Sequence, residues 1–316
     1  MKAKLAISEP FVVSLNHHAF PTSIVKTLGN HDWLYNKYIQ LYFDTQENTI
    51  DYEYDYFFYK TTALVKGFMS IPHSCLEKQE ILKLTKNIVF SGGYIYGNWN
   101  EFYIEGTSSF MKQLFRHNFF IYGYDDDKEE LNAAGYLDDG YYHNFSVKYD
   151  NFVQSLDLKR EYVIYDIAYI NRNFVQDFDI SLVEKSIKEY LDSSPVDMRR
   201  EFETQPNIQE GGIDALCKHF VSQRHSTDKI HIPRVFLLWE HKKLMHERLQ
   251  KINNECFQIP EDYLNSYLEV YNAFKTVLSL SIKYNLSRQK GIKEKIYDIE
   301  MKNTERELQI LSCIFK

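Results

Sequence analysis

The chain has few cysteines, few glycines and prolines, no long apolar run and no excess of basic residues. Its cysteines are far apart and form no CxxC pair, which argues against a disulfide framework or a cysteine metal site; they are Cys75, Cys217, Cys256 and Cys313. Neither GxxxxGK[ST] nor GxGxxG occurs, which disfavours the use of ATP or a dinucleotide. The sequence therefore predicts no cofactor and no metal.

Membranes and nucleic acids are also unexpected partners. No stretch approaches 18 apolar residues, and the first residues show neither an apolar run of signal-peptide length nor a small-residue cleavage site. A cytoplasmic location is the default expectation. The net charge of −7 repels a phosphate backbone, so general nucleic-acid binding is disfavoured.

Aromatic residues are abundant, with 25 Tyr and 22 Phe but only 3 Trp in 316 residues. Tyrosine buries area and keeps a polar tip, so this composition suits either a tyrosine-rich core or a deep, half-hydrated cleft. With 44% hydrophobic residues, 12 Gly and 7 Pro, the chain is a folded protein of one large or two smaller domains.

Two hydrophobic patterns divide the chain near residue 175. Before it, short aromatic and β-branched runs separated by turn signals predict strands at 88–96, 118–124, 141–149 and 161–170, with helices at 21–28 and 77–87. After it, a period of 3.6 predicts helices at 181–191, 212–221, 234–252, 260–284 and 292–315. We therefore predict an α+β fold, with an antiparallel-sheet domain at 1–175 and a helical domain at 176–316.

The segment most suggestive of chemistry is LNHHAFPTSIVKTLG, from Leu15 to Gly29, in which a loop with two histidines leads into an apolar helix. A nucleophile at such a helix start would have its pKa lowered by the helix dipole. About a hundred residues later, Arg116 and His117 open an apolar strand, which is how a general base is placed beside a nucleophile.

With these features the sequence resembles the family of butirosin biosynthesis protein H, whose N-terminal domains resemble papain-like and bacteriocin-processing cysteine peptidases. The likeness rests on the order of the His18–Pro21 segment (H-C-x-P in the family), the His117 strand with its GYDD hairpin, and the helical tail at 211–220 and 234–252. It implies a papain-like first domain and an acyltransferase of antibiotic biosynthesis. Such an enzyme moves an acyl group from a carrier-protein thioester, through an acyl-cysteine, to an amine.

The implied partners are an acyl or peptidyl carrier protein and an amine or small-molecule acceptor. The resemblance is incomplete, because Ala19 stands at the nucleophile position and Ala134 or Gly135 where the family's orienting Asp would be. His117 alone keeps its expected identity. There are three explanations: a natural divergent branch, a replaced cysteine, or a different register of the alignment. The missing Asp favours the divergent branch.

A divergent branch needs other polar groups, and the densest polar–aromatic cluster of the first domain runs from residue 98 to 103. We expect Glu101 to orient His117 or to act as a base, and Asn98 or Asn100 to donate to a carbonyl. Further substrate-binding candidates are Trp99, Tyr103, His18 and Pro21. The structural alternative is a tight turn with Trp99 in the core and His117 as a buried, hydrogen-bonded histidine.

Weaker candidates complete the set. His17 and His18 could ligate a metal, but no further ligand stands at suitable spacing, so a loop role is favoured. Substitute nucleophiles are Cys75, Thr22 and Ser23, and cations that could dock an acidic carrier protein are Lys112, Arg116, Arg234, Lys242 and Lys243. Three functions remain open: acyl or peptidyl transfer or release, binding of the intermediate or its carrier without covalent catalysis, and peptidase-like hydrolysis.

Overall fold

The computed structural model describes residues 1–53, 64–72, 76–156, 164–197 and 207–315. The fold is α+β, as the sequence predicts. The chain forms two compact units, the first from Met1–Asn30 and Asp55–Val175, the second from His31–Tyr54 and Gln176–Lys316. The change at residue 175 therefore coincides with a unit boundary, but His31–Tyr54 belongs with the helical part of the chain.

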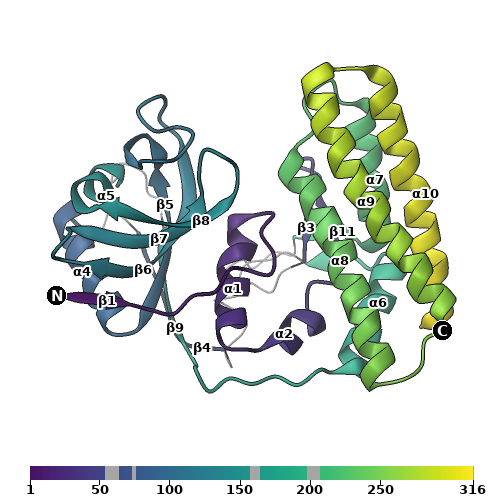
Figure 1. Cartoon of the computed structure of the whole chain (residues 1–316), viewed down its shortest axis with the longest axis horizontal. Helices are drawn as coiled ribbons and strands as arrows, with labels where there is room; N and C mark the ends of the chain where they lie inside the picture. Colours follow the sequence, from purple (N-terminus) through teal and green to yellow (C-terminus); the bar gives the residue numbers. More distant parts are fainter. Residues whose placement is uncertain (54–63, 73–75, 157–163, 198–206, 316) are drawn as a thin grey trace. The chain divides into compact units, whose positions relative to one another are not determined.

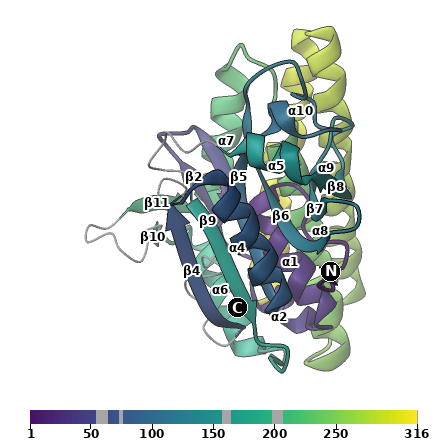
Figure 2. The same cartoon turned by 90° about the vertical axis from the view of Figure 1, so that its left-hand side faces the viewer.

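The first unit is built on a seven-stranded sheet whose recorded pairings are all antiparallel (Figure 1). Six strands lie in the order β4 (Val65–Pro72), β9 (Ile164–Ile170), β5 (Gly93–Asn100), β6 (Arg116–Asp125), β7 (Glu130–Tyr136) and β8 (Tyr142–Lys148), and β1 (Lys2–Lys4) pairs with β6. Figure 2 shows β4 and β9 side by side at one edge. The strand expected at 88–96 starts later, because the preceding helix continues to Phe90 and turns at Gly92 with φ +92°.

Helices cover both faces of this sheet: α1 (Asn16–Thr27), α4 (Lys78–Phe90), the 3₁₀ turn η2 (Glu101–Tyr103) and α5 (Tyr149–Ser155). On one face, Phe20 of α1 packs against Tyr96 and Phe120, with ring centroids 5.5 and 4.5 Å away. On the other, Trp99 stacks on Phe119 at 4.3 Å beneath α5. The aromatic residues of the predicted strands thus fill two hydrophobic layers, one on each face of the sheet.

The second unit combines a small sheet with a helical bundle. The sheet has the order β10 (Val196–Asp197), β11 (Ile208–Gly211), β2 (Leu41–Asp44) and β3 (Thr49–Tyr52). The helices are α2 (His31–Asn36), α6 (Ile180–Leu191), α7 (Gly212–His225), α8 (Ile232–Glu255), α9 (Glu261–Ser287) and α10 (Lys290–Ile314). Consecutive helices α8, α9 and α10 pack together (Figure 1). Every helix predicted after residue 175 is present, and the small sheet is an addition that the sequence analysis did not expect.

Buried cations explain why His31–Tyr54 belongs to this unit. The guanidinium of Arg248, fully buried on α8, donates to the backbone carbonyls of Tyr35 at 2.7 Å and Lys37 at 2.8 Å. Arg234 donates to the carboxylate of Asp51 at 2.6 Å. Charged groups are rarely buried without such partners, so these bonds fix the segment to α8.

No helix within the described ranges is both long and apolar enough to cross a membrane.

Acidification should destabilise the second unit through His219 of α7. Burial, with smaller effects from Arg234 and His231, lowers the pKa of His219 from 6.5 to about 3. Between these values the unfolded chain binds a proton that the folded chain does not, so stability falls as the pH falls from 6.5. At pH 5 the loss from this group is about 2 kcal/mol.

Urea unfolding followed by circular dichroism at several pH values measures this loss. The variant His219→Gln should reduce the change in unfolding free energy between pH 8 and pH 5 by about the same amount, whatever its own stability at neutral pH. An identical pH dependence in the two proteins would contradict the assignment.

Candidate functional site

His117 and Glu101 form a hydrogen-bonded pair at one end of the first unit's sheet. His117 is the second residue of β6, and Glu101 begins η2 directly after β5. The imidazole Nδ1 lies 2.7 Å from Glu101 Oε1; the side chain of Glu101 is 5% exposed and that of His117 is 38% exposed. A buried carboxylate thus orients an imidazole that solvent can reach, which is the relation expected from the sequence.

The loop between β5 and β6 holds Glu101 in place. The backbone N–H of Glu101 donates to the carbonyl of Phe115 at 2.7 Å, and the backbone carbonyl of Glu101 accepts a hydrogen bond from the hydroxyl of Thr107 at 3.1 Å. The N–H of Met111 donates to the carbonyl of Phe102 at 3.0 Å. These bonds join the two ends of the loop, so the carboxylate is presented from a well-connected segment.

The other imidazole nitrogen faces Asn16, the first residue of α1. Asn16 Nδ2 lies 3.2 Å from His117 Nε2 and also donates to the backbone carbonyl of Asn118. A carbonyl can only accept, so the Asn16 atom facing both groups is the NH₂ nitrogen. His117 Nε2 therefore accepts a hydrogen bond, and the ring proton resides on Nδ1, where it is donated to Glu101.

Asn16 and Glu101 therefore bond to the two different nitrogens of the His117 imidazole. The sequence analysis placed the nucleophile position at Ala19, and the residue that the structure brings to His117 is Asn16, three residues earlier. The physical reason is the helix start: α1 begins at Asn16, and the N–H of Ala19 already bonds to the carbonyl of Leu15 at 2.9 Å. Ala19 has no exposed surface. Asn16 is the residue that sequence reasoning missed, and its position at the start of the apolar helix was the available signal.

Two residues expected to bind substrate have structural roles instead. Trp99 is fully buried among aromatic rings, and Asn100 caps η2 by accepting the N–H of Phe102 at 3.2 Å. Tyr103 is half-buried against Phe102, with ring centroids 5.0 Å apart. Asn98 is half-buried and lies opposite Asn118 in the pairing of β5 with β6. The cluster from 98 to 103 therefore contributes Glu101 to the pair, while Asn98 and Trp99 belong to β5 and Asn100 caps η2.

The remaining candidates of α1 lie inside the first unit. His18 and Pro21 are buried, and the hydroxyls of Thr22 and Ser23 donate to the carbonyls of His18 at 2.8 Å and Ser8 at 2.5 Å. These hydroxyls are used in anchoring the helix. Cys75 lies outside the described residues.

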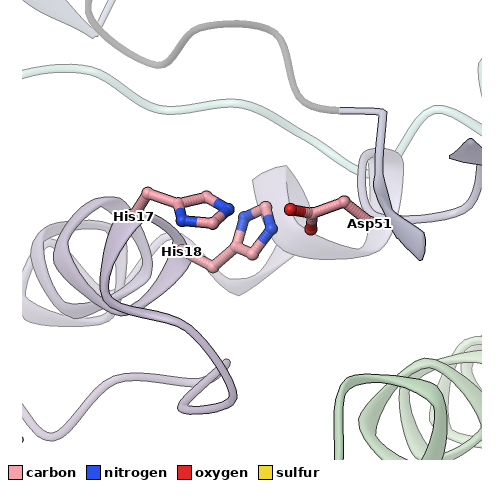
Figure 3. Close-up of side chains that lie close together, drawn as sticks. All are labelled: His17, His18 and Asp51. Atoms are coloured by element: carbon pink, nitrogen blue, oxygen red, sulfur yellow. The ribbon is translucent and has the colours of Figure 1, made fainter. Parts of the chain in front are cut away.

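His17 and His18 are neighbours at the start of α1, with ring centroids 4.3 Å apart (Figure 3). Asp51, also drawn in Figure 3, belongs to the second unit, where its carboxylate bonds to Arg234.

Two of the five cations that we expected to dock a carrier protein, Lys242 and Arg234, are not free on the surface. Lys242 has no exposed surface and pairs with Glu307 at 2.6 Å, and Arg234 is 17% exposed and held by Asp51. Lys243 is 46% exposed. Apolar periodicity alone did not reveal that a lysine inside α8 faces the core with an acidic partner.

No protein-family model matches the chain, and no curated protein matches it. The chemical groups and their geometry therefore carry the functional argument.

Proposed function

We propose that this protein binds the acyl or peptidyl thioester of a carrier protein in specialised-metabolite biosynthesis and forms no covalent intermediate. In this proposal the first unit is a papain-like domain whose nucleophile has been replaced. The supporting observation is the hydrogen bond between Asn16 and His117, at the position where this proposal puts the replaced thiol. A carboxamide is no nucleophile, so the acyl-enzyme step has no group to perform it.

The same groups suit recognition of a carbonyl. Asn16 supplies an N–H donor at the start of α1, where the helix dipole favours partial negative charge. Rotation of its carboxamide toward a ligand would free His117 Nε2 to interact with the ligand as well. Glu101 keeps the imidazole oriented throughout. The site is therefore polar, preorganised and reachable through the exposed part of His117.

The direct test incubates the full chain with acyl-loaded and unloaded carrier protein and follows both partners by intact-mass spectrometry and by binding measurements. We expect tighter binding of the loaded carrier and no acyl adduct on this chain. A stable adduct, or catalytic release or transfer of the acyl group, would replace the proposal with acyltransferase, thioesterase or peptidase-like chemistry.

Replacing His117 with alanine should weaken binding of the loaded carrier roughly tenfold, because one hydrogen bond and the support of Asn16 are lost. Binding of the unloaded carrier should not change. The variant Tyr141→Ala, at an exposed aromatic residue beyond the end of β7, is the control for a surface change that leaves the site intact. Equal affinities of wild type and His117→Ala for the loaded carrier would contradict the role of this site.

A further inference from the structure

A cavity of about 780 Å³ lies within the second unit, where α7 ends and α10 begins. Its lining carries four permanent cations and one carboxylate: Arg224, Arg288, Lys290, Lys293 and Glu294. The carboxylate is already engaged, since Glu294 Oε2 lies 2.8 Å from the Arg224 guanidinium. Such a gathering of cations is unusual in a chain whose net charge is −7.

Two of the other cations, Arg288 and Lys293, contact neutral groups. Arg288 donates to the carbonyl of Thr227 at 3.5 Å, and Lys293 to the carbonyl of Ser226. Both also face the ring of Tyr284, with Arg288 Cζ 5.7 Å and Lys293 Nζ 5.3 Å from its centroid. Lys293 is only 7% exposed. These contacts hold two positive charges beside one cavity without neutralising them.

The start of α10 strengthens the preference for an anion. Lys290 and Lys293 lie within its first four residues, the first turn has no acidic residue, and no side chain caps the helix. Cations at this end oppose the helix dipole, so they are unfavourable until an anion binds. Apart from Gly291, its chain neighbours and the backbone of α10, no atom lies within 4 Å of where a Cβ on Gly291 would be, so there is open space beside this turn.

We propose that this cavity binds the diphosphate group of a small molecule. One phosphate of charge near −2 would leave part of the cationic lining uncompensated, whereas two linked phosphates match it. The volume suits a small molecule, and the acidic chain as a whole disfavours a nucleic-acid polymer. Asp228, in the loop that follows α7, interacts with Ser226, so its negative charge reduces the positive potential near Ser226.

Arg288 offers a variant in which stability and binding should change in opposite directions. It follows Ser287 as the C-cap of α9, with φ 56°, a left-handed conformation that costs an ordinary residue energy and that glycine adopts freely. Arg288→Gly should therefore keep or raise the thermal midpoint while removing one cation from the cavity. A merely structural role for the arginine would lower the midpoint instead.

Isothermal titration calorimetry of the full chain with inorganic pyrophosphate tests the proposal. We expect saturable binding that weakens as salt rises, and roughly tenfold weaker binding in Arg288→Gly and in Lys290→Gln. Lys302→Gln, which removes an exposed cation farther along α10, is the matched control and should bind as the wild type does.

Parallel titration with ADP distinguishes the source of the diphosphate. Equal affinity for ADP and pyrophosphate indicates recognition of the diphosphate alone, and tighter binding of ADP indicates a nucleotide. The absence of pyrophosphate binding at low salt would overturn the proposal. Unchanged affinity for pyrophosphate in the double variant Arg288→Gly, Lys290→Gln would also overturn it. Tighter binding of a single-stranded oligonucleotide than of pyrophosphate or ADP would overturn it as well.

Discussion

Replacing Lys242 with methionine is expected to lower the free energy of unfolding of the second unit by about 3–5 kcal/mol. Lys242 Nζ lies 2.6 Å from Glu307 Oε2 and 3.0 Å from the hydroxyl of Tyr190, with both charged side chains completely buried. Tyr267 donates its hydroxyl to the other carboxylate oxygen. Burial lowers the pKa of Lys242, and the Glu307 carboxylate opposes that effect. Without the lysine, a carboxylate remains buried with no cation beside it.

The double variant Lys242→Met, Glu307→Leu should be closer to the wild type than Lys242→Met alone, because it removes the uncompensated charge. Lys243→Met provides the surface control. Lys243 is exposed and lies 3.8 Å from Glu247, so its replacement should change stability by less than about 0.5 kcal/mol. Urea unfolding followed by the helical circular dichroism signal measures the free energy of unfolding of all three variants. Equal losses in the single and double variants would show that packing, and not charge, dominates this site.

Replacing Asn16 with cysteine is expected to create a reactive thiol. The sulfur would stand at the first residue of α1 and beside His117 Nε2, where the helix dipole stabilises a thiolate and the imidazole can accept the thiol proton. At pH 6 its alkylation by iodoacetamide should be roughly a hundredfold faster than that of an ordinary exposed cysteine. Cys256, which is exposed, is the internal reference.

Two further variants make the comparison specific. Ala19→Cys places a thiol where the family resemblance located the nucleophile, and the complete burial of that position predicts slow alkylation. Adding His117→Ala to Asn16→Cys should return the thiol toward ordinary reactivity. With acyl-loaded carrier protein, the thiolate of Asn16→Cys should attack the thioester carbonyl, expel the carrier thiol and retain the acyl group. Faster alkylation of Ala19→Cys than of Asn16→Cys would favour position 19 as the nucleophile position.

Sequence patterns predicted the helices of the second unit well, because long segments of period 3.6 leave few alternatives. The strands around His117 and the contact of Glu101 with His117 were also correctly predicted. The β2–β3 hairpin at residues 41–52 was not predicted. Its further pairing with β11 joins residues far apart in the chain, and local periodicity carries no record of such a pairing. Asn16 was assigned no role, because the nucleophile position was taken from a family motif and not from the start of the helix.

The interleaving of the two units has a consequence for the order of synthesis. The β2–β3 hairpin leaves the ribosome before most of the first unit, whereas β11, which covers the free edge of β2, is made only after that unit's last strand, β9. An isolated two-stranded hairpin is at best marginally stable, and an open edge invites pairing with other chains. The nascent chain must therefore carry an unfinished sheet with an open edge while the first unit completes its folding.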